Sequence, residues 1–276
     1  MESYIKKDIE QVGDIDLYYE HILIHDSFPT LVLIHGFLSS SFSFRKLVPH
    51  LTKDYNVISV DLPPFGQSGK AYRYTYSFRN IADSVVQLLE GKGIKKFSII
   101  AHSMGGQVSL QLIHSYSDLV ERAVLLAGSG YEPSFPKKMK MLSYLPFFSF
   151  GVKGYLQRSG IEKNLRNVVH NQAMIDDEMR QGYLDPFMKN HDIFRALGRM
   201  LRDKEGDLSS EDLHSIHTPC LLVWGRYDKV VPLDIGNRLH EDLPNSKLIV
   251  LENTGHLLPE EKPEEVYHLI KEFLEE

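Results

Sequence analysis

The chain has 276 residues, and its 31 lysines and arginines are outnumbered by 37 aspartates and glutamates, which gives a formal net charge of −6. Its 42% hydrophobic and 25% charged residues are typical of a folded globular protein and exclude a disordered, collagen-like or coiled-coil chain. The acidic balance also argues against nucleic-acid binding, which requires clustered positive charge.

Three further features of the sequence bear on its location. Cys220 is the only cysteine, so no disulfide can form within the chain, as is usual in a reducing compartment. The first residues are polar and lack the apolar region of a signal peptide. No apolar run reaches the roughly 18 residues of a membrane-spanning helix. We therefore expect a cytoplasmic protein with no stable membrane insertion.

Short apolar runs rich in β-branched residues recur along the chain and predict strands. The first stretch, 12–24, alternates loosely and predicts an antiparallel hairpin at the edge of a sheet. The continuous runs that follow are typical of strands buried on both faces of a parallel sheet. They lie at 30–34, 56–60, 97–100, 123–126, 220–224 and 247–251.

Segments with helical periodicity alternate with these runs, at 78–89, 105–114 and 263–274. Strands that alternate with helices predict a doubly wound α/β domain.

The alternation of strands and helices fails between residue 127 and about residue 207. This stretch is mostly helical in pattern, and from 131 to 207 it carries 13 basic against 10 acidic residues in an otherwise acidic chain. We predict a helical cap at 131–207, inserted between a first part of the core at 1–130 and a second part at 208–276.

One predicted strand leads directly into a motif for nucleophilic catalysis. The run at 97–100 continues as Ala101-His-Ser103-Met-Gly105 and then into a predicted helix. This is the G-x-S-x-G nucleophile elbow with alanine in place of its first glycine. The serine of an elbow occupies a strained turn, so its neighbours at two residues on either side must be small. The free N–H groups at the start of the helix favour negative charge beside the serine. Ser103 is therefore the candidate nucleophile.

A serine hydroxyl becomes an effective nucleophile when a base removes its proton and a carboxylate orients that base. His256 lies in the loop after the last predicted strand, and Asp228 lies in the loop after the strand before it. Both loops leave the carboxyl ends of strands, the sheet edge at which Ser103 lies and at which open α/β sheets hold their active sites. We predict His256 as the base and Asp228 as the acid. Glu132, after an earlier strand, is the alternative acid.

Other motifs do not support a cofactor or a metal ion. The stretch Gly66-Gln-Ser-Gly-Lys70 lacks the first glycine and the final Ser or Thr of a phosphate loop. Gly128-Ser-Gly130 lacks the third glycine of a dinucleotide-binding fingerprint. No His-Glu-x-x-His motif occurs among the 13 histidines. We expect neither a cofactor nor a metal ion.

Together these segments resemble the α/β-hydrolase superfamily, in its branch of capped, cofactor-free serine hydrolases that includes carboxylesterases and lipases. The matching segments are His35-Gly-Phe37, Asp61-Leu-Pro-Pro-Phe-Gly-Gln-Ser68, the Ser103 elbow, Trp224-Gly-Arg-Tyr-Asp228 and Gly255-His256. The resemblance implies the α/β-hydrolase fold, a mostly parallel, doubly wound sheet with an inserted helical cap. It also implies an oxyanion hole formed by the backbone N–H groups of Phe37 and Met104, with His35 shaping the loop.

The resemblance also narrows the expected activity. Haloalkane dehalogenases and epoxide hydrolases of this fold carry aspartate at the elbow, so Ser103 argues against both. We expect a hydrolase that cleaves carboxylic esters with small or medium acyl chains through an acyl-serine intermediate. The segment Trp224 to Pro232 resembles meta-cleavage-product hydrolases, so a carbon–carbon bond hydrolase or lyase is an alternative. A slow-turnover ligand-binding or signalling protein is another.

An aromatic segment of the predicted cap bears on the substrate. Residues 141–150 include four aromatic side chains, with three lysines just before them and Lys153 just after. Two interpretations are open. The segment packs the cap onto the core, or it forms an apolar pocket for an acyl or aromatic group, with a lysine rim that meets water or an anionic surface.

Overall fold

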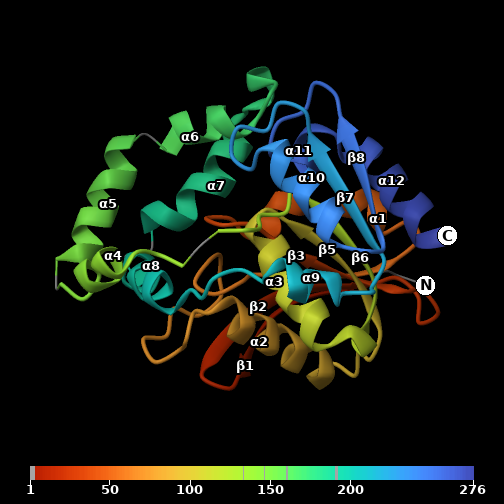
Figure 1. The fold of residues 1–276 in the computed structure, drawn as a ribbon, viewed down its shortest axis with the longest axis horizontal. Helices are drawn as coiled ribbons and strands as arrows, with labels where there is room; N and C mark the ends of the chain where they lie inside the picture. Colours follow the sequence, from red (N-terminus) through yellow and green to blue (C-terminus); the bar gives the residue numbers. More distant parts are fainter. Residues whose placement is uncertain (1–3, 133, 146, 160, 190–191) are drawn as a thin grey trace.

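A sheet runs through the middle of the molecule, and helices cover both of its faces (Figure 1). The computed structural model describes residues 4–132, 134–145, 147–159, 161–189 and 192–276. Within these residues the sheet has eight strands. They are β1 (Tyr4–Val12), β2 (Ile15–Leu23), β3 (Thr30–Ile34), β4 (Asn56–Val60), β5 (Phe97–His102), β6 (Val120–Leu126), β7 (Cys220–Gly225) and β8 (Ser246–Leu251).

The order of the strands brings distant parts of the sequence to one edge of the sheet. The order is β1-β2-β4-β3-β5-β6-β7-β8, with β1–β2 and β2–β4 antiparallel and every other pair of neighbours parallel. The continuous apolar runs correspond to β3 through β8, so the predicted mostly parallel, doubly wound sheet is confirmed. Because β5, β7 and β8 are parallel, the loops that follow them leave from the same edge.

The two outer edges of the sheet differ from the prediction. The hairpin predicted at 12–24 is formed by β1 and β2, in which Tyr4 pairs with Leu23 and Val12 with Ile15. The first strand was missed because four of its nine side chains are charged and it contains no continuous apolar run. The prediction that the last strand is buried on both faces was also wrong. β8 is an edge strand, and Leu251 is the only one of its six residues that is buried.

Helix α2 shows how the sequence sets the start and the buried face of a core helix. In α2 the side chain of Ser77 accepts the N–H of Asn80, and Ile81, Val85 and Leu88 share the buried face. The core helices and 3₁₀ turns are η1 (Ser41–Phe44), α1 (Val48–Leu51), α2 (Phe78–Gly91), α3 (Met104–Ser115), η2 (Ser117–Leu119), α9 (Ser210–His214), α10 (Leu233–Asp242), α11 (Leu258–Glu261) and α12 (Pro263–Glu275).

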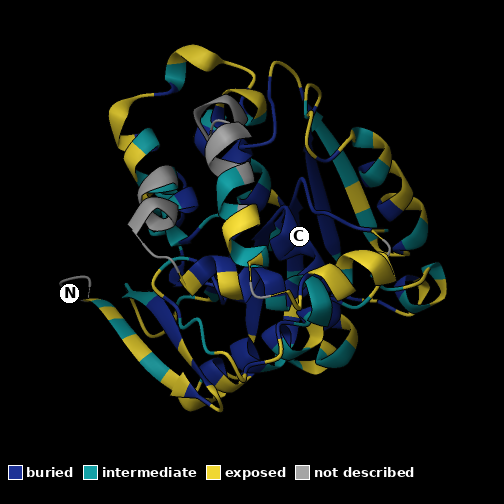
Figure 2. Ribbon diagram, turned by 90° about the vertical axis from the view of Figure 1, so that its left-hand side faces the viewer, coloured by how far each residue is buried: buried dark blue, intermediate teal, exposed yellow. Residues whose placement is uncertain are grey.

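A group of helices between β6 and α9 stands to one side of the sheet, at the left of Figure 1. These are α4 (Lys137–Leu142), α5 (Phe148–Ser159), α6 (Ile161–Val168), η3 (Gln172–Met174), α7 (Asp177–Lys189) and α8 (Asp192–Asp203). We refer to them as the cap helices, and the boundaries 131–207 stay a prediction. In α8, Phe194 and Met200 join the core of the sheet. Figure 2 shows buried residues concentrated in the sheet and exposed residues along the edge hairpin and the outer helices.

In the described part of the chain, no helix combines the length and apolar character needed to cross a membrane.

Candidate active site

Ser103 lies at the turn between β5 and α3 in a strained backbone conformation. Its φ is 54° and its ψ is −123°, a combination that residues with a side chain rarely adopt. The turn leaves no room for a larger residue at position 105, because a Cβ on Gly105 would lie 2.2 Å from the carbonyl oxygen of Ile34. Ala101 is fully buried in β5. The close packing explains why the positions on both sides of the serine hold small residues.

The loop after β3 passes directly beside Ser103. A Cβ on Gly36 would lie 2.9 Å from the Cβ of Ser103. His35 fixes this loop, because its Nε2 accepts the N–H of Leu62 (2.8 Å) and its Nδ1 donates to the carbonyl of Gly36 (2.7 Å). Burial lowers the pKa of His35, which keeps the ring neutral. These bonds agree with the expected role of His35 in shaping the loop.

Phe37 and Met104, the predicted oxyanion-hole residues, both belong to segments that meet at the serine. Phe37 follows the glycine that approaches Ser103. Met104 is the first residue of α3, so its N–H has no partner within the helix. Both residues line the same cavity as Ser103. Their backbone N–H groups stay the predicted oxyanion hole.

Asp228 and His256 are in direct contact. Asp228 lies just beyond the end of β7, and His256 lies just beyond the end of β8. Nδ1 of His256 donates a hydrogen bond to Oδ2 of Asp228 at 2.7 Å, and both side chains are buried. Because the carboxylate acts as the acceptor, Nδ1 carries the proton and Nε2 has the free lone pair that a general base requires.

The carboxylate of Asp228 is held in a fixed direction. Its Oδ1 accepts the backbone N–H groups of Val230 (2.8 Å) and Val231 (2.9 Å). The indole N–H of Trp224 donates to the carbonyl of Val231 at 3.0 Å, which fastens this loop to the end of β7. One carboxylate oxygen is therefore occupied by its own loop, and the other is directed at His256.

Glu132, the alternative acid, has a different partner. Its carboxylate accepts a hydrogen bond from the ammonium group of Lys204 at 2.6 Å, and its side chain is 57% exposed. Lys204 itself is buried. The geometry therefore favours Asp228 over Glu132 as the residue that orients His256.

The backbone of His256 is held from two sides. From the sheet, Nε2 of His102 donates to the carbonyl oxygen of His256 at 2.8 Å, and the two rings lie 4.7 Å apart. From the cap helices, the carbonyl of Val168 at the end of α6 accepts the N–H of His256 at 2.7 Å. Burial and the neighbouring His256 lower the pKa of His102 to about 3, so its ring is neutral. Because His102 directly precedes Ser103, its bond ties the His256 loop to the residue before the candidate nucleophile.

Glu261, at the end of α11, joins the His256 loop to the cap helices. Its Oε1 accepts the N–H of Gly255 at 2.9 Å, and its Oε2 accepts the N–H of His170 at 2.8 Å. One carboxylate therefore satisfies a backbone donor on each side of the contact. Sequence analysis missed this residue, because nothing in the local pattern distinguishes Glu261 from the glutamates around it.

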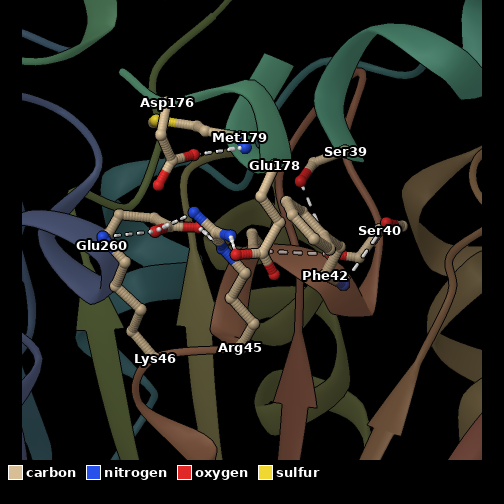
Figure 3. Close-up of polar contacts among 10 residues, drawn as sticks. Ser39, Ser40, Phe42, Arg45, Lys46, Asp176, Glu178, Met179 and Glu260 are labelled. Atoms are coloured by element: carbon tan, nitrogen blue, oxygen red, sulfur yellow. Dashed lines mark hydrogen bonds and ion pairs between the residues drawn. The ribbon is translucent and has the colours of Figure 1, made fainter. Parts of the chain in front are cut away.

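An ion-pair cluster adds a second connection between α11 and the cap helices (Figure 3). Glu260 is fully buried and accepts hydrogen bonds from Nε (2.9 Å) and Nη2 (3.2 Å) of Arg45. Nη1 of Arg45 pairs with Glu178 of α7 at 2.8 Å. The guanidinium also stacks over the ring of Phe42, 4.6 Å from its centre. Arg45 thus links the segment after His256 to α7.

A cavity of about 740 Å³ lies beside Ser103, within the size range of small-molecule sites. Its wall is mostly apolar and combines core residues such as Phe37 and Val230 with cap residues such as Met139 and Phe148. The Glu132–Lys204 ion pair is also part of the wall. No group of three or more His, Cys, Asp or Glu side chains among the described residues is arranged to hold a metal ion.

The aromatic segment 141–150 follows neither of its two interpretations fully. Phe148 lines the cavity. Tyr144, Phe147 and Phe150, in contrast, are exposed to solvent. One interpretation placed the aromatic residues at the cavity, and neither interpretation anticipated that three of the four would be exposed.

Comparison with known proteins decides the family. A family model described as alpha/beta hydrolase fold matches residues 29–263. The chain belongs to the α/β-hydrolase family. It is also 44% identical over 263 residues to an uncharacterized hydrolase, YugF, from Bacillus subtilis, which covers 95% of this chain and 96% of that protein. This α/β hydrolase is therefore an enzyme of the hydrolase class.

More distant relatives and solved structures differ in their described activities. A 2-hydroxy-6-oxononadienedioate/2-hydroxy-6-oxononatrienedioate hydrolase from Paraburkholderia phymatum is 29% identical, covering 89% of this chain and 86% of that protein. A membrane phospholipase A structure superposes with a TM-score of 0.81 at 24% identity, covering 98% of this chain and 86% of that one. The 2-hydroxy-6-oxo-6-phenylhexa-2,4-dienoate hydrolase of Rhodococcus sp. strain RHA1 superposes with a TM-score of 0.79 at 21% identity, over 100% of both chains. These structures share the fold of this α/β hydrolase.

Replacing His102 by glutamine tests whether the buried ring affects stability at low pH. The native ring has a pKa of about 3, whereas an unfolded histidine titrates near about 6.5. The unfolded state therefore binds an extra proton between these pH values, and stability falls as the pH drops through them. Between about pH 6 and pH 4 we expect the free energy of unfolding to fall more steeply in the wild type than in H102Q, by up to about 1.4 kcal/mol per pH unit. Urea denaturation at a series of pH values measures this, and parallel slopes would contradict it.

Replacing Glu261 by alanine tests the connection between the His256 loop and the cap helices. The N–H groups of Gly255 and His170 lose their acceptor, so we expect the free energy of unfolding to fall by about 1–3 kcal/mol. Glu264→Ala, on the exposed face of α12, is the matched control and should change it by less than about 0.5 kcal/mol. Urea denaturation of the two variants side by side measures the difference. Equal effects would show that the contact contributes nothing.

Proposed function

We propose that this α/β hydrolase cleaves carboxylic esters with small or medium acyl chains through an acyl-serine intermediate. Ser103 is the nucleophile, His256 the general base and Asp228 the residue that orients His256. The backbone N–H groups of Phe37 and Met104 form the oxyanion hole. No cofactor takes part in this mechanism.

Each step of the proposed reaction uses a group already described. His256 Nε2 takes the proton of the Ser103 hydroxyl as its oxygen attacks the ester carbonyl. The oxyanion that forms accepts the N–H groups of Phe37, in the loop after β3, and of Met104, at the N-terminus of α3, where negative charge is favoured. His256 then protonates the departing alcohol, and a water molecule, activated by His256 in turn, releases the acid from Ser103.

The observation that carries this proposal is the 2.7 Å hydrogen bond between Asp228 and His256. It fixes the tautomer in which Nε2 is free to act on a serine. The bond is found at the edge of the sheet where Ser103 occupies a strained turn, beside a largely apolar cavity. A strained serine, an oriented histidine and an apolar cavity together support acyl transfer to Ser103.

A carbon–carbon bond hydrolase is the second candidate. The 29% identical relative from Paraburkholderia phymatum is described as acting on an oxo-dienedioate, a substrate with carboxylate groups. Lys204 provides a cation in the cavity wall that suits a carboxylate. This cation is already paired with Glu132 at 2.6 Å, so a substrate carboxylate would have to displace that partner. We therefore favour the ester, which needs no cation in the wall.

Replacing Ser103 by alanine tests the nucleophile and the substrate class together. The variant should keep its fold and lose ester hydrolysis by about 10⁴–10⁶-fold, because no other group can form the acyl intermediate. The assay is a series of acyl esters of increasing chain length, run beside a dienol ketone. We expect kcat/KM to be larger for the esters. Faster cleavage of the dienol ketone would favour the carbon–carbon hydrolase, and a single turnover followed by negligible rate would favour a slow ligand-binding protein.

Replacing Asp228 by asparagine tests the assignment of the acid. Asparagine keeps the shape but can present a donor to Nδ1 of His256, so the imidazole loses its orienting acceptor. We expect kcat to fall by about 10³–10⁴-fold. Glu132→Gln is the matched control and should cost less than about tenfold, because Glu132 bonds to Lys204 instead. Both variants are measured on one activated ester, and a larger loss in Glu132→Gln would contradict the assignment.

A further inference from the structure

An exposed apolar surface covers α4 and the segment leading into α5. Large apolar side chains here are between 39% and 75% exposed. We call this set the α4–α5 face, and it consists of Phe135, Met139, Met141, Leu142, Tyr144, Leu145, Phe147 and Phe150. Large apolar patches on a protein surface mark sites of interaction with other proteins or with membranes.

The charge of the same segment restricts what can cover this face. Residues 133–161 contain five basic residues and no acidic residue, in a chain whose net charge is −6. Lys137 and Lys138 are exposed at the start of α4, next to the apolar side chains. Lys140 instead donates to the backbone carbonyls of Arg202 and Lys204. Exposed aromatic and aliphatic side chains beside lysines are typical of segments that lie in the interface of an anionic membrane.

A second copy of the chain fits this face less well. Homodimers usually pair the same surface of each copy across a twofold axis. Such a pairing would bring two lysine-rich segments with no acidic residue together, and like charges across an interface are unfavourable. An anionic lipid surface satisfies both the apolar side chains and the lysines.

The α4–α5 face is also connected to the cavity at Ser103. Phe135 and Met139 belong to the face and also line the cavity. Phe148, which lies in the sequence between the exposed Phe147 and Phe150, lines the cavity as well. Phe37 and Val230, on the core side of the cavity, are also about half exposed. An acyl chain that leaves a bilayer at this face therefore meets apolar side chains continuously as far as the serine.

We propose that the α4–α5 face docks on the surface of an anionic phospholipid bilayer and that the substrate is an ester whose acyl chain enters the cavity from that bilayer. The inference rests on the proposed ester hydrolysis and names the source of its substrate. Docking is peripheral, because the face buries side chains in the interface and does not span the bilayer. Each methylene group that moves from water into lipid favours the bilayer, so medium-chain esters concentrate at the surface where the enzyme docks.

Binding to lipid vesicles tests the docking step. The Ser103→Ala protein is mixed with vesicles of phosphatidylcholine, with or without about one third phosphatidylglycerol, and bound protein is measured by flotation. We expect binding to the phosphatidylglycerol vesicles, weaker binding to phosphatidylcholine alone, and a loss of affinity as salt screens the lysines. Equal or absent binding to the two kinds of vesicle would overturn the proposal.

Matched variants assign the binding to the face. Phe147→Ser with Phe150→Ser should lower the partition coefficient by at least about tenfold, since both rings are more than 70% exposed. Lys137→Glu with Lys138→Glu should abolish the preference for phosphatidylglycerol. Ile5→Ser with Ile9→Ser, which removes exposed apolar side chains from edge strand β1, is the control and should bind as the parent does. Loss of binding in the control alone would place docking elsewhere and contradict the proposal.

Measurements of ester hydrolysis distinguish a failure of membrane docking from a failure of the proposed esterase activity. In the background with Ser103 intact, all three double variants should hydrolyse a short, water-soluble ester at the parent rate, because none of the changed residues lines the cavity. The Phe147/Phe150 variant should lose at least about tenfold in rate on a medium-chain ester carried in phosphatidylglycerol vesicles. Hydrolysis of the soluble ester without vesicle binding would overturn docking and leave the esterase proposal intact. Vesicle binding without any ester hydrolysis would overturn the esterase proposal.

Sedimentation tests the remaining occupant of the face. A dimer that is broken by the same serine substitutions would assign the face to a second copy.

Discussion

The strained turn at Ser103 is the constraint on which the rest of the site depends. A residue at φ 54° and ψ −123° stays there because β5, α3 and the loop after β3 close around it. The approach is so close that position 105 has no room for a side chain beside the carbonyl of Ile34. The same closeness brings the loop of Phe37 to the serine. The close packing around this turn thus accounts for the small residues of the motif. The turn joins the end of β5 to the start of α3, which places the site at the edge of the sheet.

The second organising feature is the way His256 is held between the sheet and the cap helices. Its carbonyl accepts from His102 and its N–H donates to Val168, so neither side alone fixes it. Glu261 and the Arg45 cluster add bonds from the following helix to the same cap segments. The cap helices therefore do more than form the cavity wall. The position of His256 therefore depends on the cap helices as well as on the sheet.

Most of the sheet can be predicted from the sequence, and the candidate site residues can be picked out from it, because both depend on local patterns. The apolar runs of β3 to β8 are continuous, and the Ser103 motif lies between a strand and a helix, so each is visible in a short window. Strand β1 was missed because its four charged residues interrupt the apolar ones and leave no continuous apolar run. His102, Glu261 and Val168 were missed for a related reason. Their roles come from contacts between segments far apart in the chain, and each of these contacts involves a backbone group that leaves no mark in the sequence. The outward direction of Phe147 and Phe150 was also beyond prediction, since composition does not say which face of a helix meets solvent.

Peptide mapping after reaction with an alkyl phosphonate ester measures the central claim most directly. Such a reagent transfers its phosphonyl group to a serine, with loss of its leaving group, where a base activates the serine hydroxyl and an oxyanion hole binds the phosphonyl oxygen. The account predicts one phosphonyl group per chain, attached to Ser103 in the peptide that joins β5 to α3. It also predicts much slower labelling in His256→Ala, because the base is then missing. Stoichiometric labelling of any other residue, or labelling of Ser103 at an undiminished rate without His256, would contradict it.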